Sequence, residues 1–294
     1  MLSYLIAILI VTGIYALLTQ ALNFHYGFMG LINFGHVGFF AIGAYTSALL
    51  TLSGHSIALG FVAAIVLAAL SACPLGLLAL RLREDYLAIV TLGFAEIVRV
   101  VIVSEDWLTR GTQGLANVPR PFASLGASGQ EIAYLGLVVA CNVLAAALIA
   151  RLAYSPFGRL IEAIRDDETA ISTLGKYPAG AKLRVFMVGA GIAGLAGALY
   201  AHYITYVVPD QFVPLVTFYV WMAMILGGVG SLPGSFIGAA ILVALLEGTR
   251  FIRDLLPGVM EIQMASVRIF LIGVGLVLFV LLRPQGVMGL RVRT

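Results

Sequence analysis

The chain has 294 residues, of which 61% are hydrophobic and only 11% are charged, and its formal net charge is +3. Because a soluble domain carries about a quarter charged residues, this composition excludes an ordinary soluble enzyme, a disordered tail and a nucleic-acid-binding protein. The two cysteines, Cys73 and Cys141, lie in apolar runs and indicate no disulfide framework. The composition therefore predicts a membrane protein that crosses the bilayer several times.

About nine apolar runs are candidates for membrane-spanning helices, each of which needs roughly 20 mostly apolar residues. In chain order they are 2–22, 32–52, 57–80, 86–104, 131–152, 183–207, 213–228, 234–250 and 266–283. No run alternates as a strand does, and backbone groups in lipid are satisfied within a helix. We therefore predict an all-α polytopic membrane protein with about 8–10 transmembrane helices, some of them broken or re-entrant, in a single domain over residues 1–294. The first run has no basic segment before it, so we expect a retained helix and not a cleaved signal peptide.

Basic residues mark one side of the membrane. They gather in the 153–182 connection with its flanks, in the short link at 81–83 and in the tail from residue 283 onward. Positively charged loops stay in the cytoplasm, so these three segments are expected inside. Alternation of the helices then places the 105–130 loop and the N-terminus outside.

The segment Ser155–Gly175, SPFGRLIEAIRDDETAISTLG, predicts a short amphipathic helix on the cytoplasmic side. Its polar residues include Glu162, Arg165, Asp166, Asp167 and Glu168. Either this helix docks a soluble partner or it lies on the lipid headgroups. A lipid-binding face is rich in Lys and Arg, whereas this face mixes acids with one arginine, which favours docking.

Glu96 and Arg99 stand near the middle of the 86–104 run. Their i, i+3 spacing places them on one helix face, within pairing distance. A charged side chain at the bilayer centre costs about 2.5–3.5 kcal/mol on insertion scales, so such residues usually face the bundle interior and pair. Either the pair borders a translocation path, or it is a buried structural ion pair that locks two helices. The residues alone favour neither interpretation.

Glycines interrupt the apolar run Asn23–Tyr45, NFHYGFMGLINFGHVGFFAIGAY, and Asn33 and His36 stand at the interruption. Glycine permits an opened backbone, and Asn and His can bond the freed groups. Broken helices recur at transport sites, which makes both residues candidates for substrate contact. The alternative, that they only connect two helices, is somewhat favoured. No carboxylate or cysteine keeps ligand spacing with the histidines, so no metal site is predicted.

Small residues recur at every fourth position between Gly189 and Ala198, which favours close packing of that helix against its neighbours. No stretch of the chain follows the phosphate-binding pattern GxxxxGK[ST], and no catalytic set of side chains stands out. We therefore predict a chain that is not an enzyme, has no ATPase motif and binds no cofactor itself.

Six motifs follow one another along nearly the whole chain. They are LNFHYGFMGLINFGHVGFFAIGAY, RLREDYLAIVTLGFAEIVR, SPFGRLIEAIRDDETAISTLG, AGLAGALYAHY, ILGGVGSLPGSFIGAA and RPQGVMG. In this order they resemble the M-type (LivM-like) permease subunits of branched-chain amino acid ABC importers. The motifs identify the family better than the substrate, because closely related permeases carry urea or other small amides.

The resemblance implies one half of a pseudo-symmetric membrane domain in the bacterial cytoplasmic (inner) membrane, paired with an H-type permease subunit. Two ATP-binding subunits, which use the ATP, would dock on a coupling segment within 153–182. An extracytoplasmic substrate-binding protein would deliver the substrate. The outer loop at 105–130 is the expected place of contact, although the resemblance constrains this loop least. The expected ATPase-coupling residues are Glu162, Arg165, Asp166, Asp167 and Glu168. The resemblance supplies no substrate contacts position by position, so the expected residues of the translocation path, Asn33, His36, Thr91, Glu96 and Arg99, rest on their residue types and places in the apolar runs.

The expected function is ATP-driven import of branched-chain or related amino acids by alternating access. One alternative keeps this architecture and carries urea or a short amide. A second alternative is an ion-coupled secondary carrier that works alone, with Glu96 as its protonatable residue.

Overall fold

The computed structural model describes residues 2–78, 84–255, 270, 273–275, 277, 281, 283 and 285–288. Its long helices are α1 (Leu2–Met29), α2 (His36–Leu52), α3 (Ile57–Leu78), α4 (Glu84–Ser104), α6 (Gly126–Ala153), α9 (Pro178–Ile204), α10 (Pro214–Gly227) and α11 (Leu232–Leu255). Five of them, α1, α3, α4, α6 and α9, are long and apolar enough to cross a membrane, and α2, α10 and the apolar part of α11 are shorter. The predicted all-α polytopic membrane fold is confirmed. The last predicted run, 266–283, lies mostly outside the described residues.

The first helix is longer than the predicted run, because α1 continues beyond residue 22 to Met29. The prediction ends early because Asn23 and His25 lower the local hydropathy. Both side chains are fully buried and find hydrogen-bond partners inside the bundle, so they do not end the helix. The backbone leaves the helix at Gly30, whose φ of 76° is in the left-handed region that favours glycine.

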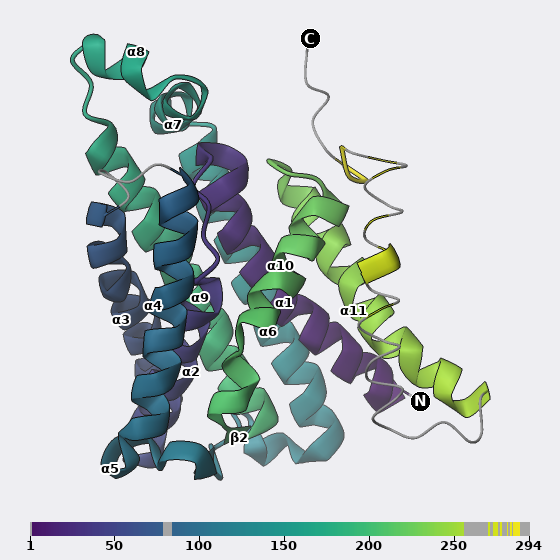
Figure 1. Cartoon of the computed structure of the whole chain (residues 1–294). Helices are drawn as coiled ribbons and strands as arrows, with labels where there is room; N and C mark the ends of the chain where they lie inside the picture. The colour runs from purple at the N-terminus through teal and green to yellow at the C-terminus, as the bar shows by residue number, and fades with distance from the viewer. Residues whose placement is uncertain are drawn as a thin grey trace.

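Short elements lie at the two ends of the helix bundle. Figure 1 shows α7 (Pro156–Asp166) and α8 (Glu168–Thr173) at one end, and α5 (Asp106–Thr109) and β2 (Tyr206–Val207) at the other. The remaining short elements are η1 (Gly111–Gln113), β1 (Leu115–Ala116), η2 (Ala123–Leu125) and η3 (Pro209–Phe212). β1 pairs with β2 in antiparallel fashion, with Leu115 opposite Val207. The 105–130 and 153–182 segments therefore lie at opposite ends of the bundle, as the alternation of helices predicts.

The 155–175 segment forms two helices and not the predicted single one. Asp167 separates them with an extended backbone (φ −158°, ψ 99°). Its carboxylate accepts a hydrogen bond of 2.9 Å from the backbone N–H of Ala170, which caps the start of α8. Asp167, which in the sequence is only one of several charged residues, therefore caps the start of a second helix.

The helix α9 is central and packs against α1, α2, α3 and α7. Its small residues permit this, as the four-residue spacing predicts: Gly194, Gly197 and Ala198 are all buried. A Cβ on Gly197 would lie 2.0 Å from the carbonyl oxygen of Phe40, and a Cβ on Gly43 would lie 2.1 Å from the carbonyl oxygen of Gly194. The backbones of α2 and α9 are therefore in direct contact.

Candidate functional site

The helix α7, together with α8 after it, forms a polar ledge (residues 156–173) at its end of the bundle. Ser155 caps its start, since Oγ accepts hydrogen bonds from the backbone N–H groups of Phe157 (3.1 Å) and Gly158 (3.4 Å). Pro156 occupies the first helical turn, where its missing N–H costs nothing. Ile161 and Ile164 are buried, and α7 contacts α1, α6 and α9. The apolar face thus fixes α7 on the bundle and leaves the opposite face free.

The five predicted coupling residues are all exposed on α7 and α8: Glu162, Arg165, Asp166, Asp167 and Glu168. Four of them nevertheless have partners within the chain, and one of these contacts is the ion pair between Arg165 and Asp166. Arg165 donates a 2.9 Å hydrogen bond from Nη1 to the carbonyl oxygen of Gly27, Asp167 caps α8, and Glu168 accepts a 2.7 Å hydrogen bond from Lys182. Glu162 has no side-chain hydrogen bond to the described part of the chain. That these residues face an ATPase remains a prediction.

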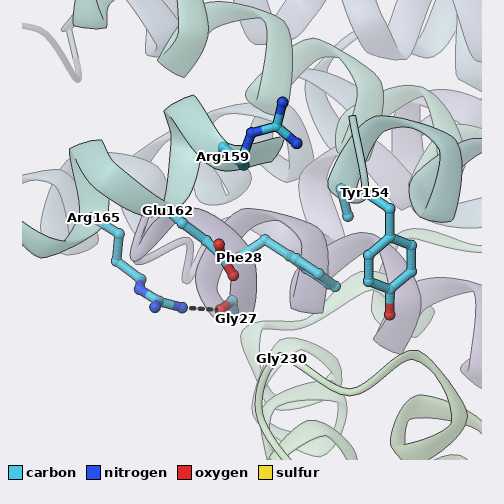
Figure 2. Close-up of a pocket in the computed structure, with 8 residues that line it drawn as sticks. Gly27, Phe28, Tyr154, Arg159, Glu162, Arg165 and Gly230 are labelled. Carbon is cyan, nitrogen blue, oxygen red and sulfur yellow. Dashed lines mark hydrogen bonds between the residues drawn. The ribbon is translucent and has the colours of Figure 1, made fainter. Parts of the chain in front are cut away.

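A pocket of about 340 Å³ lies beneath α7, where the ends of several helices meet. Figure 2 shows Arg165 reaching from α7 to Gly27, while Arg159 extends away from Gly27. The residues that line the pocket are Gly27, Phe28, Ala153, Tyr154, Arg159, Glu162, Arg165 and Gly230. Sequence reasoning missed Gly27 and Gly230 as neighbours of α7, because they come from distant parts of the chain.

Asn23 connects α1 to the corner between α10 and α11. Its amide nitrogen donates hydrogen bonds of 2.9 Å to the carbonyl oxygen of Ser231 and to Oγ of Ser235. Its amide oxygen accepts a 2.8 Å hydrogen bond from the backbone N–H of Gly230. The sequence reveals Asn23 only as an amide inside an apolar run, without its partners.

Residues 30–35 form the predicted break between α1 and α2, and side chains from other helices satisfy its backbone. The N–H of Phe34 donates to Oγ1 of Thr91 on α4 at 3.0 Å. The N–H of Val37, in the first turn of α2, donates to Oγ1 of Thr217 on α10 at 3.0 Å. Trp221 on α10 donates to the carbonyl oxygen of Asn33 at 3.1 Å. These three backbone groups at the break are therefore bonded inside protein, as an opened segment in a membrane requires.

Two histidines pack beside this break. The amide nitrogen of Asn33 lies 3.2 Å from Nδ1 of His25, whose Nε2 lies 3.1 Å from the carbonyl oxygen of Phe186. Nε2 of His36 lies 3.1 Å from the carbonyl oxygen of Leu18. Asn33, His36 and Thr91 are fully buried. These contacts occupy the side chains of Asn33 and Thr91, whereas Nδ1 of His36 is buried without a hydrogen-bond partner in the described part of the chain. Substrate contact by any of the three remains a prediction.

Glu96 and Arg99 form the predicted i, i+3 ion pair, but on the outer face of α4. The Glu96 side chain is 43% exposed and that of Arg99 is 29% exposed. Ile89, Gly93 and Ile97 are exposed along the same helix. The interpretation as a buried ion pair that locks two helices of this chain is wrong, because α4 packs against α2 through its other side. A role in the translocation path remains a prediction.

The 105–130 loop is tied to the end of α9. Besides the β1–β2 pairing, Arg120 donates a 2.8 Å hydrogen bond to the carbonyl oxygen of Tyr203 and lies over its ring. Nδ1 of His202 lies 2.6 Å from the carbonyl oxygen of Pro119. Trp107, in contrast, is 81% exposed. The loop therefore presents a large aromatic side chain on an ordered support.

No group of three or more His, Cys, Asp or Glu residues in the described part of the chain is arranged to hold a metal ion. Several apolar helices, a broken span and a polar helical ledge at one end together define a multi-pass membrane protein. The chain belongs to the family described as branched-chain amino acid transport system / permease component, which matches residues 4–282.

Relatives support this assignment. The chain is 36% identical over 304 aligned positions to the high-affinity branched-chain amino acid transport system permease protein LivM of Escherichia coli (strain K12), covering 94% of this chain and 68% of the relative. It is 27% identical to the probable LivM of Methanocaldococcus jannaschii, covering 79% and 77%. It is also 29% identical to LivH of Escherichia coli (strain K12), covering 78% and 79%. No solved structure gives a significant match. The resemblance found in the motifs is confirmed.

Proposed function

We propose that the chain is the permease subunit of an ATP-driven importer that carries branched-chain or related amino acids across a bacterial inner membrane by alternating access. The observation that carries this proposal is the α7–α8 ledge. The relatives of the chain, which are named as branched-chain amino acid permeases, support the same proposal. The ledge is polar outside and anchored inside by Ile161 and Ile164. A subunit without a phosphate-binding pattern depends on a separate ATPase, and it needs a surface through which movement of that ATPase is transmitted.

The proposed partners follow from the two ends of the bundle and from the relatives. Two ATP-binding subunits dock at the α7–α8 end, where Glu162 and Asp166 are exposed. An extracytoplasmic binding protein touches the 105–130 loop at the other end, where Trp107 is exposed. An H-type permease is the second membrane subunit, because this chain is similar to both LivM and LivH proteins, as expected for two related halves.

The exposed α4 face is the proposed side on which the second permease and the translocation path lie. An ion pair inside the membrane is costly in lipid and usually faces protein or a water-filled cavity. The side chains of Glu96 and Arg99 are 43% and 29% exposed, and a second subunit would shield the part that this chain leaves uncovered. Thr91 lies on the same helix and accepts a hydrogen bond from the backbone N–H of Phe34 in the break, so the broken span is in contact with α4.

Purification from native membranes in mild detergent, followed by mass spectrometry, tests the assembly. The expected result is a second permease and two ATP-binding chains in stoichiometric amounts. Competition between leucine and urea for uptake then tests the cargo, with leucine expected to compete and urea not. Recovery of this chain alone, still folded and able to transport along a proton gradient, would contradict the proposal and favour an ion-coupled carrier with Glu96 as its protonatable residue.

A further inference from the structure

Arg165 belongs to the exposed ledge, but its guanidinium points inward to the end of α1. Nη1 donates a 2.9 Å hydrogen bond to the carbonyl oxygen of Gly27 (Figure 2). This carbonyl is in the last turn of α1, where carbonyl groups lack intrahelical partners and the helix dipole favours a cation. The stem of Arg165 lies over Gly30, since a Cβ on Gly30 would lie 3.0 Å from Cγ of Arg165. Arg165 thus caps α1 from a different helix.

Gly27 in turn lies against the corner between α10 and α11. A Cβ on Gly27 would lie 2.5 Å from the backbone nitrogen of Gly230, so the two backbones touch. Asn23, one turn earlier in α1, holds the same corner through Gly230, Ser231 and Ser235. A displacement of the end of α1 cannot leave this corner in place without breaking several buried hydrogen bonds.

The corner also receives the C-terminal segment of the chain. The backbone N–H groups of Val287 and Met288 donate 2.9 Å hydrogen bonds to the carbonyl oxygens of Leu226 and Gly227 at the end of α10. A Cβ on Gly286 would lie 2.6 Å from Gly228. The end of α1, the α10–α11 corner and residues 286–288 are therefore one packed junction, and Arg165 is the side chain that reaches it from α7.

We propose that Arg165 is a positioning residue that transmits the position of α7 to the junction of α1 with the α10–α11 corner, and that it is not a docking contact for the ATPase. This rests on the proposed function, because it names the route by which movement of α7 reaches the membrane helices. Asp166 supports the role, since Oδ1 accepts hydrogen bonds of 3.3 Å from Nε and Nη2 of Arg165 and leaves Nη1 directed at Gly27. Rigid, contiguous contacts of this kind can carry coupling between distant sites.

The test compares Arg165→Gln with Arg159→Gln in the reconstituted complex. Arg159 is the matched control, because it lines the same pocket from the same helix and its side chain has no hydrogen bond to the described part of the chain. Three quantities are measured for each variant: the ATP-binding chains that co-purify, the rate of ATP hydrolysis, and the ATP hydrolysed per leucine imported. Arg165→Gln is expected to keep its ATP-binding chains and at least half of its ATP hydrolysis, while ATP per leucine rises at least fivefold. Arg159→Gln is expected to change ATP per leucine less than twofold.

Two further variants keep the proposal testable if Arg165→Gln assembles poorly. Arg165→Lys retains a donor for the Gly27 carbonyl and is expected to restore most of the coupling. Ser235→Ala removes a hydrogen bond of Asn23 at the α10–α11 corner and so weakens the same junction. In the double variant its effect on ATP per leucine is expected not to add to that of Arg165→Gln, since both substitutions act on this junction. Loss of the ATP-binding chains in both Arg165 variants would show a docking contact and overturn the proposal, as would normal ATP per leucine in Arg165→Gln. Absence of ATP-dependent uptake by the wild-type complex would instead overturn the proposed function itself.

Discussion

Glu168, the first residue of α8, and Lys182, in the second turn of α9, form a 2.7 Å ion pair. The Lys182 side chain is only 10% exposed, whereas that of Glu168 is 47% exposed. The pair therefore connects α8 to the N-terminal end of α9. In the sequence, Glu168 is one of several acidic residues with no visible partner.

Replacing Glu168 by Gln is expected to loosen α8 without unfolding the bundle. Glu168 is about half exposed, and Gln keeps an amide oxygen that can accept from Lys182, so the loss is about 1 kcal/mol or less. The apolar contacts of α7 remain. Amide hydrogen exchange in residues 168–177 should therefore become faster, while the melting temperature of the bundle stays within a few degrees. Glu162→Gln is the control and should leave exchange in α8 unchanged. Equal exchange in the two variants would contradict a structural role for the pair.

Reversing the charge at Glu162 and Asp166 is expected to weaken docking of the ATP-binding subunits. Both residues are exposed on α7, and like charges facing each other in an interface are repulsive. The double variant Glu162→Lys, Asp166→Lys should co-purify at least about tenfold less ATP-binding protein. The same change at Glu131, in α6 at the opposite end of the bundle, should not. Equal loss in both variants would indicate misfolding, and no loss in either would remove α7 as the docking surface.

The exposed face of α4 is expected to contact the second permease. A photo-cross-linking residue in place of Ile97, which is 64% exposed, should yield an adduct with the mass of two permease chains. The matched control replaces Leu144 on α6, which is 69% exposed and should give no such adduct. Cross-linking from position 144 and not from position 97 would move the interface to α6 and leave Glu96 and Arg99 without the proposed shield.

A methyl group at Gly197 is expected to destabilise the bundle. The added carbon would overlap the carbonyl of Phe40, and overpacking of this kind costs about 1–3 kcal/mol. Gly136→Ala is the control, because nothing lies within 4 Å of a Cβ at that position. Thermal unfolding in detergent should show a lower melting temperature for Gly197→Ala and an equal or higher one for Gly136→Ala. Similar melting temperatures for the two variants would contradict direct backbone contact between α2 and α9.

Helix positions are predictable from the sequence because hydropathy is local, and the break near Gly30 is predictable because glycines and buried amides cluster there. The end of α1 is not, since the partners that bury Asn23 are near residue 231. The inward role of Arg165 is hidden for the same reason: its acceptor at Gly27 is 138 residues away. The surroundings of Glu96 and Arg99 depend on which face of α4 packs against α2, and the apolar residues around that helix do not distinguish its faces.

Uptake of labelled leucine by proteoliposomes tests the central claim most directly. The liposomes contain the complex purified from native membranes, with ATP on the side of α7 and leucine-loaded binding protein on the side of the 105–130 loop. The account predicts that uptake requires both ATP and the binding protein and stops when ATP is replaced by a non-hydrolysable analogue. Uptake of equal rate without ATP, driven by a proton gradient through this chain alone, would contradict it.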